Sequence, residues 1–183
     1  GASARSPCPR MLYAVILLWP LTCLVVLAVC LTWLAIVDLH TGDLPDPLQA
    51  VLALSGLIAA IVGSPVGISW QDGLIGAAIN GGVFWGLRWL VSRLKGREAM
   101  GFGDVKLVAA GGLWLGPFAL PYIMAAGGLL TLAGAGIVGL ATGKPVWRGE
   151  MPLGPGLAAG ILGTFIAALA GVSWLTLAPL ALP

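Results

Sequence analysis

The sequence predicts an all-α, polytopic membrane protein with about six transmembrane helices. Of its 183 residues, 59% are hydrophobic and only 9% are charged, and the mean hydropathy is +1.02. A soluble domain usually carries about 25% charged residues, so this chain has too few to cover a surface that faces water. Its apolar residues gather in six stretches, as expected when lipid is the solvent for most of the chain.

These six stretches give the predicted helices in order, since a span needs about 17–25 apolar residues. They cover residues 11–37, 48–62, 74–94, 105–120, 122–141 and 157–182. The first is interrupted only by Pro20, and the second and fourth are short for a span. Gly116, Pro117 and Pro121 predict a tight turn between the fourth and fifth.

The chain is predicted to form one domain. Residues 1–10, which start without methionine, are interpreted as an N-terminal tail or an expression remnant, and residues 11–183 as a single transmembrane domain. Under six alternating spans, seven basic residues fall on one side, and the positive-inside rule places that side in the cytoplasm. They are Arg88, Arg93, Lys95, Arg97, Lys106, Lys144 and Arg148. Arg5 and Arg10 fall on the other side.

Composition argues against several classes of function. The net charge of +2 gives no sign of nucleic-acid binding. Cys8, Cys23 and Cys30 form no Cys-x-x-Cys pair, and His40 is the single histidine, so we expect neither a disulfide framework nor a metal site. We expect no cofactor either. The sequence does not fix the oligomeric state.

Two aspartates are the strongest candidates for chemistry. An ionisable group within or at the edge of a span is costly and is therefore a functional candidate. Asp38 continues the first apolar stretch, and Asp104 lies at the mouth of the fourth. The predicted topology puts both at the cytoplasmic face, where packed helices could bring them together. Two adjacent carboxylates in a low dielectric share one proton, so one can activate water while the other donates to a carbonyl oxygen.

Each acid also has a simpler interpretation. Asp38 and Asp104 could be helix N-caps or solvated interfacial acids. Asp43 and Asp46 lie beside prolines and resemble turn and cap residues, and Asp72 could cap the third span.

The motif around Asp104 is more specific. Residues 100–106 read MGFGDVK, in which glycines flank the acid; glycine adopts backbone conformations closed to other residues and lets a substrate strand approach. This string resembles the GxGD motif of type IV prepilin peptidases and archaeal preflagellin peptidases. Residues 38–46, DLHTGDLPD, resemble the first catalytic block of that family. Residues 151–155, MPLGP, resemble its third block, with Leu153 in place of the usual aromatic residue. The resemblance covers roughly residues 30–160.

The resemblance implies an aspartic endopeptidase in the inner membrane that needs no metal or cofactor and cleaves prepilin or pseudopilin leaders. Asp38 and Asp104 would be catalytic. The residues implied to shape or support the site are Gly101, Gly103, Lys106, Pro152, Gly154 and Pro155. Lys106 could balance the charge of the aspartates or only snorkel to the interface. Asp43, Asp46 and Glu98 could meet the basic leader. The longer bifunctional members carry a Cys-rich insertion associated with N-methylation, which is absent here, so peptidase activity alone is expected.

Two other classes of function remain open. Intramembrane acids also serve proton relays, so a small proton-linked transporter or channel is one alternative. That class would place acids near mid-span and a polar stripe through several helices. The other is a non-catalytic scaffold of a pilus or secretion system, which would tolerate the loss of either Asp38 or Asp104.

Overall fold

The computed structural model describes residues 9–42, 44–96, 101–142 and 153–172, and these ranges fold into α-helices. The helices are α1 Pro9–Thr41, α2 Asp46–Gly63, α3 Trp70–Lys95, α4 Phe102–Leu115, α5 Leu120–Thr142 and α6 Gly154–Leu169. Each overlaps one of the six predicted apolar stretches, and the described ranges contain no strand, so the all-α prediction is confirmed. Residues 173–182 of the predicted sixth stretch lie outside the described residues.

Four of these helices contain a segment long and apolar enough to cross a membrane. The segments are Leu18–Thr41, Asp46–Gly63, Trp70–Leu94 and Leu120–Ile137. Helix α6 is apolar but has only 16 residues, and α4 has 14. At 1.5 Å per residue α4 is about 21 Å long, shorter than the roughly 30 Å hydrocarbon core of a bilayer. The polytopic membrane architecture is confirmed, and α4 is an interior helix of the bundle.

The outer surface of the bundle is apolar, as a lipid-facing surface must be. On α1 the exposed side chains include Val25, Val29, Trp33 and Ile36. Their spacing of three and four residues makes one stripe along the helix, while Leu27, Leu31 and Leu34 on the other side are buried. Such a stripe would be an aggregation hazard in water and is the normal surface of a helix in lipid.

Helix α4 lies at the centre of the bundle. Ten of its fourteen residues are buried, and it packs against α2, α3 and α6. Near its end, the indole Nε1 of Trp114 donates to the carbonyl of Leu52 on α2 at 3.0 Å. The same indole stands edge-on to Phe165 of α6, with ring centroids 5.6 Å apart. A helix that is apolar on all sides needs neighbours around it, and these contacts supply them.

Helices α3 and α4 approach until their backbones touch. A Cβ atom on Gly112 of α4 would stand 2.5 Å from the carbonyl carbon and oxygen of Gly76 on α3, closer than any real Cβ contact. Small residues at a crossing allow this approach, and in lipid the close packing itself drives helix association. Gly76 and Gly112 therefore serve helix packing at this crossing.

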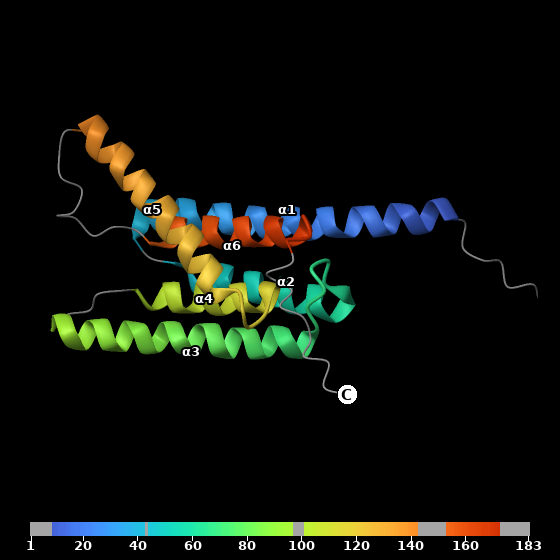
Figure 1. The fold of residues 1–183 in the computed structure, drawn as a ribbon, viewed down its shortest axis with the longest axis horizontal. Helices are drawn as coiled ribbons and strands as arrows, with labels where there is room; N and C mark the ends of the chain where they lie inside the picture. The colour runs from blue at the N-terminus through green and yellow to red at the C-terminus, as the bar shows by residue number, and fades with distance from the viewer. Residues whose placement is uncertain (1–8, 43, 97–100, 143–152, 173–183) are drawn as a thin grey trace, which may run out of the picture.

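The helix ends that carry the candidate site gather at one end of the bundle. Figure 1 shows α1 and α6 side by side, with α5 running obliquely across them. The end of α1 and the starts of α4 and α6 lie together at the left of that view. Residues far apart in the sequence therefore meet at this end.

Helix α1 extends further than the apolar pattern predicts. The apolar stretch stops at Val37, but the helix continues to Thr41, so Asp38 lies inside its last turn. Gly42 then takes the left-handed conformation (φ 66°), and its N–H donates to the carbonyl of Asp38 at 2.8 Å. This is the usual way in which a glycine ends a helix. The polar link thus begins one turn later than predicted.

Candidate active site

Asp38 and Asp104 are held in the interior of the bundle by the ends of two different helices. Asp38 comes from the last turn of α1 and Asp104 from the first turn of α4. Their exposed fractions are only 6% and 7%, so neither is a solvated interfacial acid. Burying a carboxylate is costly unless it is paired or shares a proton, so two buried acids at one end of the bundle require an explanation.

The two carboxylates lie close enough for the charge of Asp38 to act on Asp104. Helices α1 and α4 are not packed along their lengths; α1 packs on α2 and α6, and α4 packs on the same two helices. The sequence-based expectation that the two acids form a catalytic pair stays a prediction. A pair of this kind can hold one proton between its members, which is the arrangement that acid–base chemistry on water requires.

Helix α6 closes one side of the site. Its first residue, Gly154, lies directly against the carboxylate of Asp38, so a Cβ atom there would overlap the carboxyl group and stand 2.8 Å from its Cγ. The N-terminus of a helix carries a partial positive charge and favours a nearby anion. Pro155 follows in the first turn, where proline is well tolerated because its missing N–H has no helical partner.

Replacing Gly154 with alanine is expected to lower the proposed peptidase activity about a hundredfold without unfolding the protein. The new methyl group must displace the Asp38 carboxylate, and misplacement of a reacting group by about 1 Å can cost this much. Cleavage rate and melting temperature in detergent are the measurements. Gly163→Ala is the matched control, since it lies on the same helix and its Cβ would meet no atom within 4 Å. Equal activities for the two variants would contradict the prediction.

The two glycines of the GxGD string have different roles. Gly101 is the N-cap of α4 with extended backbone (φ −63°, ψ 145°), and a Cβ there would lie 3.9 Å from Oδ2 of Asp104. A Cβ on Gly103 would stand 2.8 Å from the Cβ of Leu44. Neither glycine has a positive φ, so the expectation that they serve special backbone conformations is wrong. Gly103 is required for space, because α2 and the segment before it press against the motif.

Lys106 points away from the two aspartates. Its Nζ forms an ion pair with Asp46, the first residue of α2, and also lies 5.2 Å from the ring centroid of Phe102. The described structure thus gives Lys106 a role in joining α4 to α2. The Asp46 side chain is 74% exposed, so this pair is an interfacial one.

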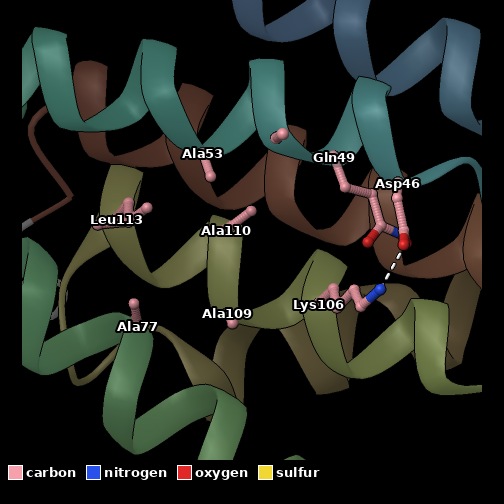
Figure 2. Close-up of a pocket in the computed structure, with 9 residues that line it drawn as sticks. Asp46, Gln49, Ala53, Ala77, Lys106, Ala109, Ala110 and Leu113 are labelled. Carbon is pink, nitrogen blue, oxygen red and sulfur yellow. Dashed lines mark hydrogen bonds and ion pairs between the residues drawn. The ribbon is translucent and has the colours of Figure 1, made fainter.

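A groove of about 380 Å³ runs between α2 and α3 over α4 (Figure 2). Small side chains line most of it, and Asp46, Gln49 and Lys106 gather at one end. Its full lining is Asp46, Gln49, Ala50, Ala53, Ala77, Lys106, Ala109, Ala110 and Leu113. With about 100° between successive helical residues, the α4 residues of this groove lie on the face opposite Asp104. The groove is therefore separate from the carboxylate pair.

Sequence reasoning missed Gln49. It is 97% buried, since its exposed fraction is 3%, and its Nε2 donates to the carbonyl of Gly103 at 3.0 Å. A signal was present in the sequence: a carboxamide within an apolar stretch, three residues after Asp46 and so on the same side of the helix. Nothing in the sequence paired it with residue 103, because that contact depends on how α2 packs against α4.

Several predicted site residues cannot be placed. Asp43, Glu98 and Pro152 lie outside the described residues. In the described ranges no group of three or more His, Cys, Asp or Glu side chains could hold a metal ion. Cys23 and Cys30 are both buried in α1 with free thiols.

Comparison with known proteins gives consistent matches. Relatives named prepilin leader peptidase/N-methyltransferase include one from Burkholderia pseudomallei (strain K96243), 38% identical over 140 residues, which are 73% of this chain and 42% of the relative. One from Dichelobacter nodosus is 37% identical over 135 residues, covering 72% and 45%. One from Aeromonas hydrophila is 38% identical over 139 residues, covering 72% and 46%. The chain thus spans less than half the length of these relatives. No solved structure gives a significant match.

The model of the type IV leader peptidase family matches residues 25–176. This range contains α2 to α6, the last part of α1 and both aspartates of the site. The resemblance seen in the three sequence blocks is thereby confirmed, and the chain belongs to the type IV leader peptidase family.

Proposed function

We propose that this chain is a membrane aspartic endopeptidase that removes the basic leader from prepilin or pseudopilin substrates. The observation that carries the proposal is that Asp38 and Asp104, two acids from distant parts of the sequence, are both buried and lie within electrostatic reach of each other. Membership of a family whose relatives are named prepilin leader peptidases supports the substrate class.

The proposed reaction uses the two carboxyl groups and one water molecule. The ionised carboxylate removes a proton from water, and the water oxygen bonds to the carbonyl carbon of the scissile peptide. The protonated carboxyl gives its proton to the carbonyl oxygen. When the C–N bond breaks, the leaving nitrogen takes the proton from one carboxyl group, and a hydroxyl of the tetrahedral diol returns its proton to the other carboxylate as the new carbonyl forms. The pair then holds one proton again, as at the start. Burial suits this cycle because two neighbouring carboxylates in a low dielectric hold a single proton between them.

The substrate would approach as a membrane peptide. Its apolar helix would lie in the bilayer against the bundle, with the leader junction at the end where α1 ends and α4 and α6 begin. A glycine before the cut would help unwind the helix and present an extended bond. Arg88, Arg93 and Lys106 belong to the helix ends near the site, and the positive-inside rule supports placing that end at the cytoplasmic face of the inner membrane.

The proposal is tested by incubating the purified protein, in detergent or in liposomes, with a peptide that carries a basic leader, a glycine and an apolar helix. Mass spectrometry should find two products whose masses locate the cut directly after the glycine. A second peptide with leucine in place of that glycine serves as the control and should be cleaved far more slowly. Intact substrate after prolonged incubation with folded protein would refute the proposal.

Asp46 is proposed, with Asp43 and Glu98, to meet basic residues of the leader. We expect Asp46→Asn to raise KM a few-fold for a basic leader and to leave a neutral leader unaffected. An exposed ion pair contributes about 0.2–1 kcal/mol, and the Asp46 side chain is both exposed and shared with Lys106. The difference should shrink as salt is added, because exposed charges are screened. An equal change in KM for both leaders would assign Asp46 to structure alone.

The alternative of a proton-linked transporter finds no support in the described helices. Such a protein needs acids near mid-span. Each acid in the described ranges, namely Asp38, Asp46, Asp72 and Asp104, lies in the first or last turn of its helix. Asp72 belongs to a capping pair in which Ser69 accepts from its N–H at 3.1 Å.

A further inference from the structure

The described core contains two buried carboxamides, and each binds one end of α4. Gln49 of α2 donates through Nε2 to the carbonyl of Gly103 at 3.0 Å. Asn80 of α3 donates through Nδ2 to the carbonyl of Gly116 at 3.2 Å. In both residues the amide oxygen is buried with no hydrogen-bond partner among the described residues. A buried acceptor without a donor destabilises a fold, so each carboxamide needs a reason to be present.

For Asn80 the reason is structural. Gly116 follows the end of α4 with a non-helical backbone (φ 78°, ψ −173°) and is buried. Its carbonyl lies beyond the hydrogen-bonded part of the helix, so the Asn80 side chain supplies the donor that it would otherwise lack. The satisfied carbonyl offsets the cost of the unpartnered Asn80 oxygen.

This reason does not apply to Gln49. Gly103 lies in the first turn of α4, where its carbonyl accepts from the N–H of the residue four positions on, as in any α-helix. The bond from Gln49 is therefore additional. In Asn80 the cost of the unpartnered oxygen is offset, because the side chain satisfies a carbonyl that has no other donor. Gln49 also has an unpartnered oxygen, but the carbonyl that it binds already has a helical donor. Destabilising arrangements that persist in this way concentrate at functional sites.

The position of the bond suggests its function. The carbonyl of Gly103 belongs to the same planar peptide unit as the backbone nitrogen of Asp104, so fixing the carbonyl fixes the orientation of the chain entering Asp104. The contact comes from the first turn of α2, which a short link joins to the last turn of α1 and hence to Asp38. The Asp46–Lys106 ion pair joins the same two helices one turn further along α4. Helix α2 thus connects the two segments that carry the aspartates.

We propose that Gln49 is a positioning residue, which sets the placement of Asp104 relative to Asp38 through the Gly103 carbonyl. The inference rests on the proposed peptidase function and assigns within it a residue outside the three sequence blocks. Gln49 touches neither substrate nor reacting atoms in this scheme. Its unpartnered amide oxygen lowers the stability of the fold, while its bond to the Gly103 carbonyl holds the geometry of the carboxylate pair.

The first test is Gln49→Met, a substitution of similar shape that removes both the donor and the unpartnered oxygen. We expect kcat for the leader peptide to fall about tenfold or more with little change in KM, since geometry rather than binding is altered. The melting temperature in detergent should stay the same or rise, because the unsatisfied oxygen is gone.

The matched control is Asn80→Leu, which removes the other carboxamide from the opposite end of α4. Here the expectation is reversed. The melting temperature should fall, since the buried carbonyl of Gly116 loses its donor, while kcat per folded molecule should match the wild type. The pair of variants separates positioning from support of the fold.

Gln49→Glu provides a test that does not depend on how Gln49→Met folds. A glutamate can donate to the Gly103 carbonyl only when protonated, and its ionised form would repel that oxygen. Relative to the wild type measured at each pH, its kcat should be near normal at low pH and fall as pH rises. A constant ratio to wild type across the pH range would overturn the inference.

The outcomes also distinguish the inference from the function on which it rests. If the wild type does not cleave the leader peptide, the proposed function fails. If the wild type cleaves and Gln49→Met keeps full kcat, the positioning role fails alone. The role also fails if Gln49→Met loses activity only in proportion to the loss of folded protein.

Discussion

Asn in place of either Asp38 or Asp104 is expected to reduce leader cleavage about a thousandfold or more. An asparagine side chain can neither accept the proton of water nor donate one to the carbonyl oxygen, and a positioned acid or base contributes about 10²–10⁴-fold. Because the two carboxyl groups act together in one step, one on water and the other on the carbonyl oxygen, each single variant should lose nearly as much as the double variant. Product formation measured by mass spectrometry, with purified protein in detergent, gives the comparison.

These variants should remain folded, which makes the result interpretable. Asparagine has nearly the shape of aspartate, and both sites are buried, so removing a charge there relieves desolvation. Asp72→Asn is the matched control, since Asp72 lies at the start of α3 in a capping pair with Ser69. It should cleave like the wild type. Full activity in either the Asp38 or the Asp104 variant would instead favour the non-catalytic scaffold.

The second large effect concerns the fold. Gly112→Ala is expected to destabilise the bundle by about 1–3 kcal/mol, the usual cost of an inserted methyl group in a well-packed interior. The methyl would overlap the backbone of Gly76 and lie 2.7 Å from the backbone nitrogen of Ala77, and a backbone cannot rotate away as a side chain can. Thermal unfolding in detergent, followed by tryptophan fluorescence, should show a melting temperature several degrees lower.

Gly82→Ala is the control for this effect. It lies on the same helix as Gly76, and a Cβ there would meet no atom within 4 Å. Alanine forms helix more readily than glycine, by about 1 kcal/mol, so the control should be as stable as the wild type or more so. If the melting temperature of Gly112→Ala equals that of Gly82→Ala, the packing of α3 on α4 does not depend on this close approach.

The architecture could be predicted well because it follows from composition. A chain with so few charges has lipid as its main solvent. Within lipid every backbone N–H and C=O group needs a hydrogen-bond partner in the protein itself, so the apolar stretches form helices. Helix ends were predicted less well. The apolar stretch that ends at Val37 gives no sign that Asp38 belongs to the helix, since the end is set by the left-handed turn at Gly42.

By itself the sequence determined that lipid is the main solvent of this protein, in which order its helices follow and to which family it belongs. It also marked Asp38 and Asp104 as the candidate catalytic residues. Each of these depends on residue type and local order, which a one-dimensional reading contains. Only the tertiary structure decided that Lys106 pairs with Asp46, that Gly103 and Gly154 are needed for space, and that Gln49 binds the motif. Those contacts join separate helices, and their geometry arises from side-chain packing across helix crossings, which no spacing along the chain specifies.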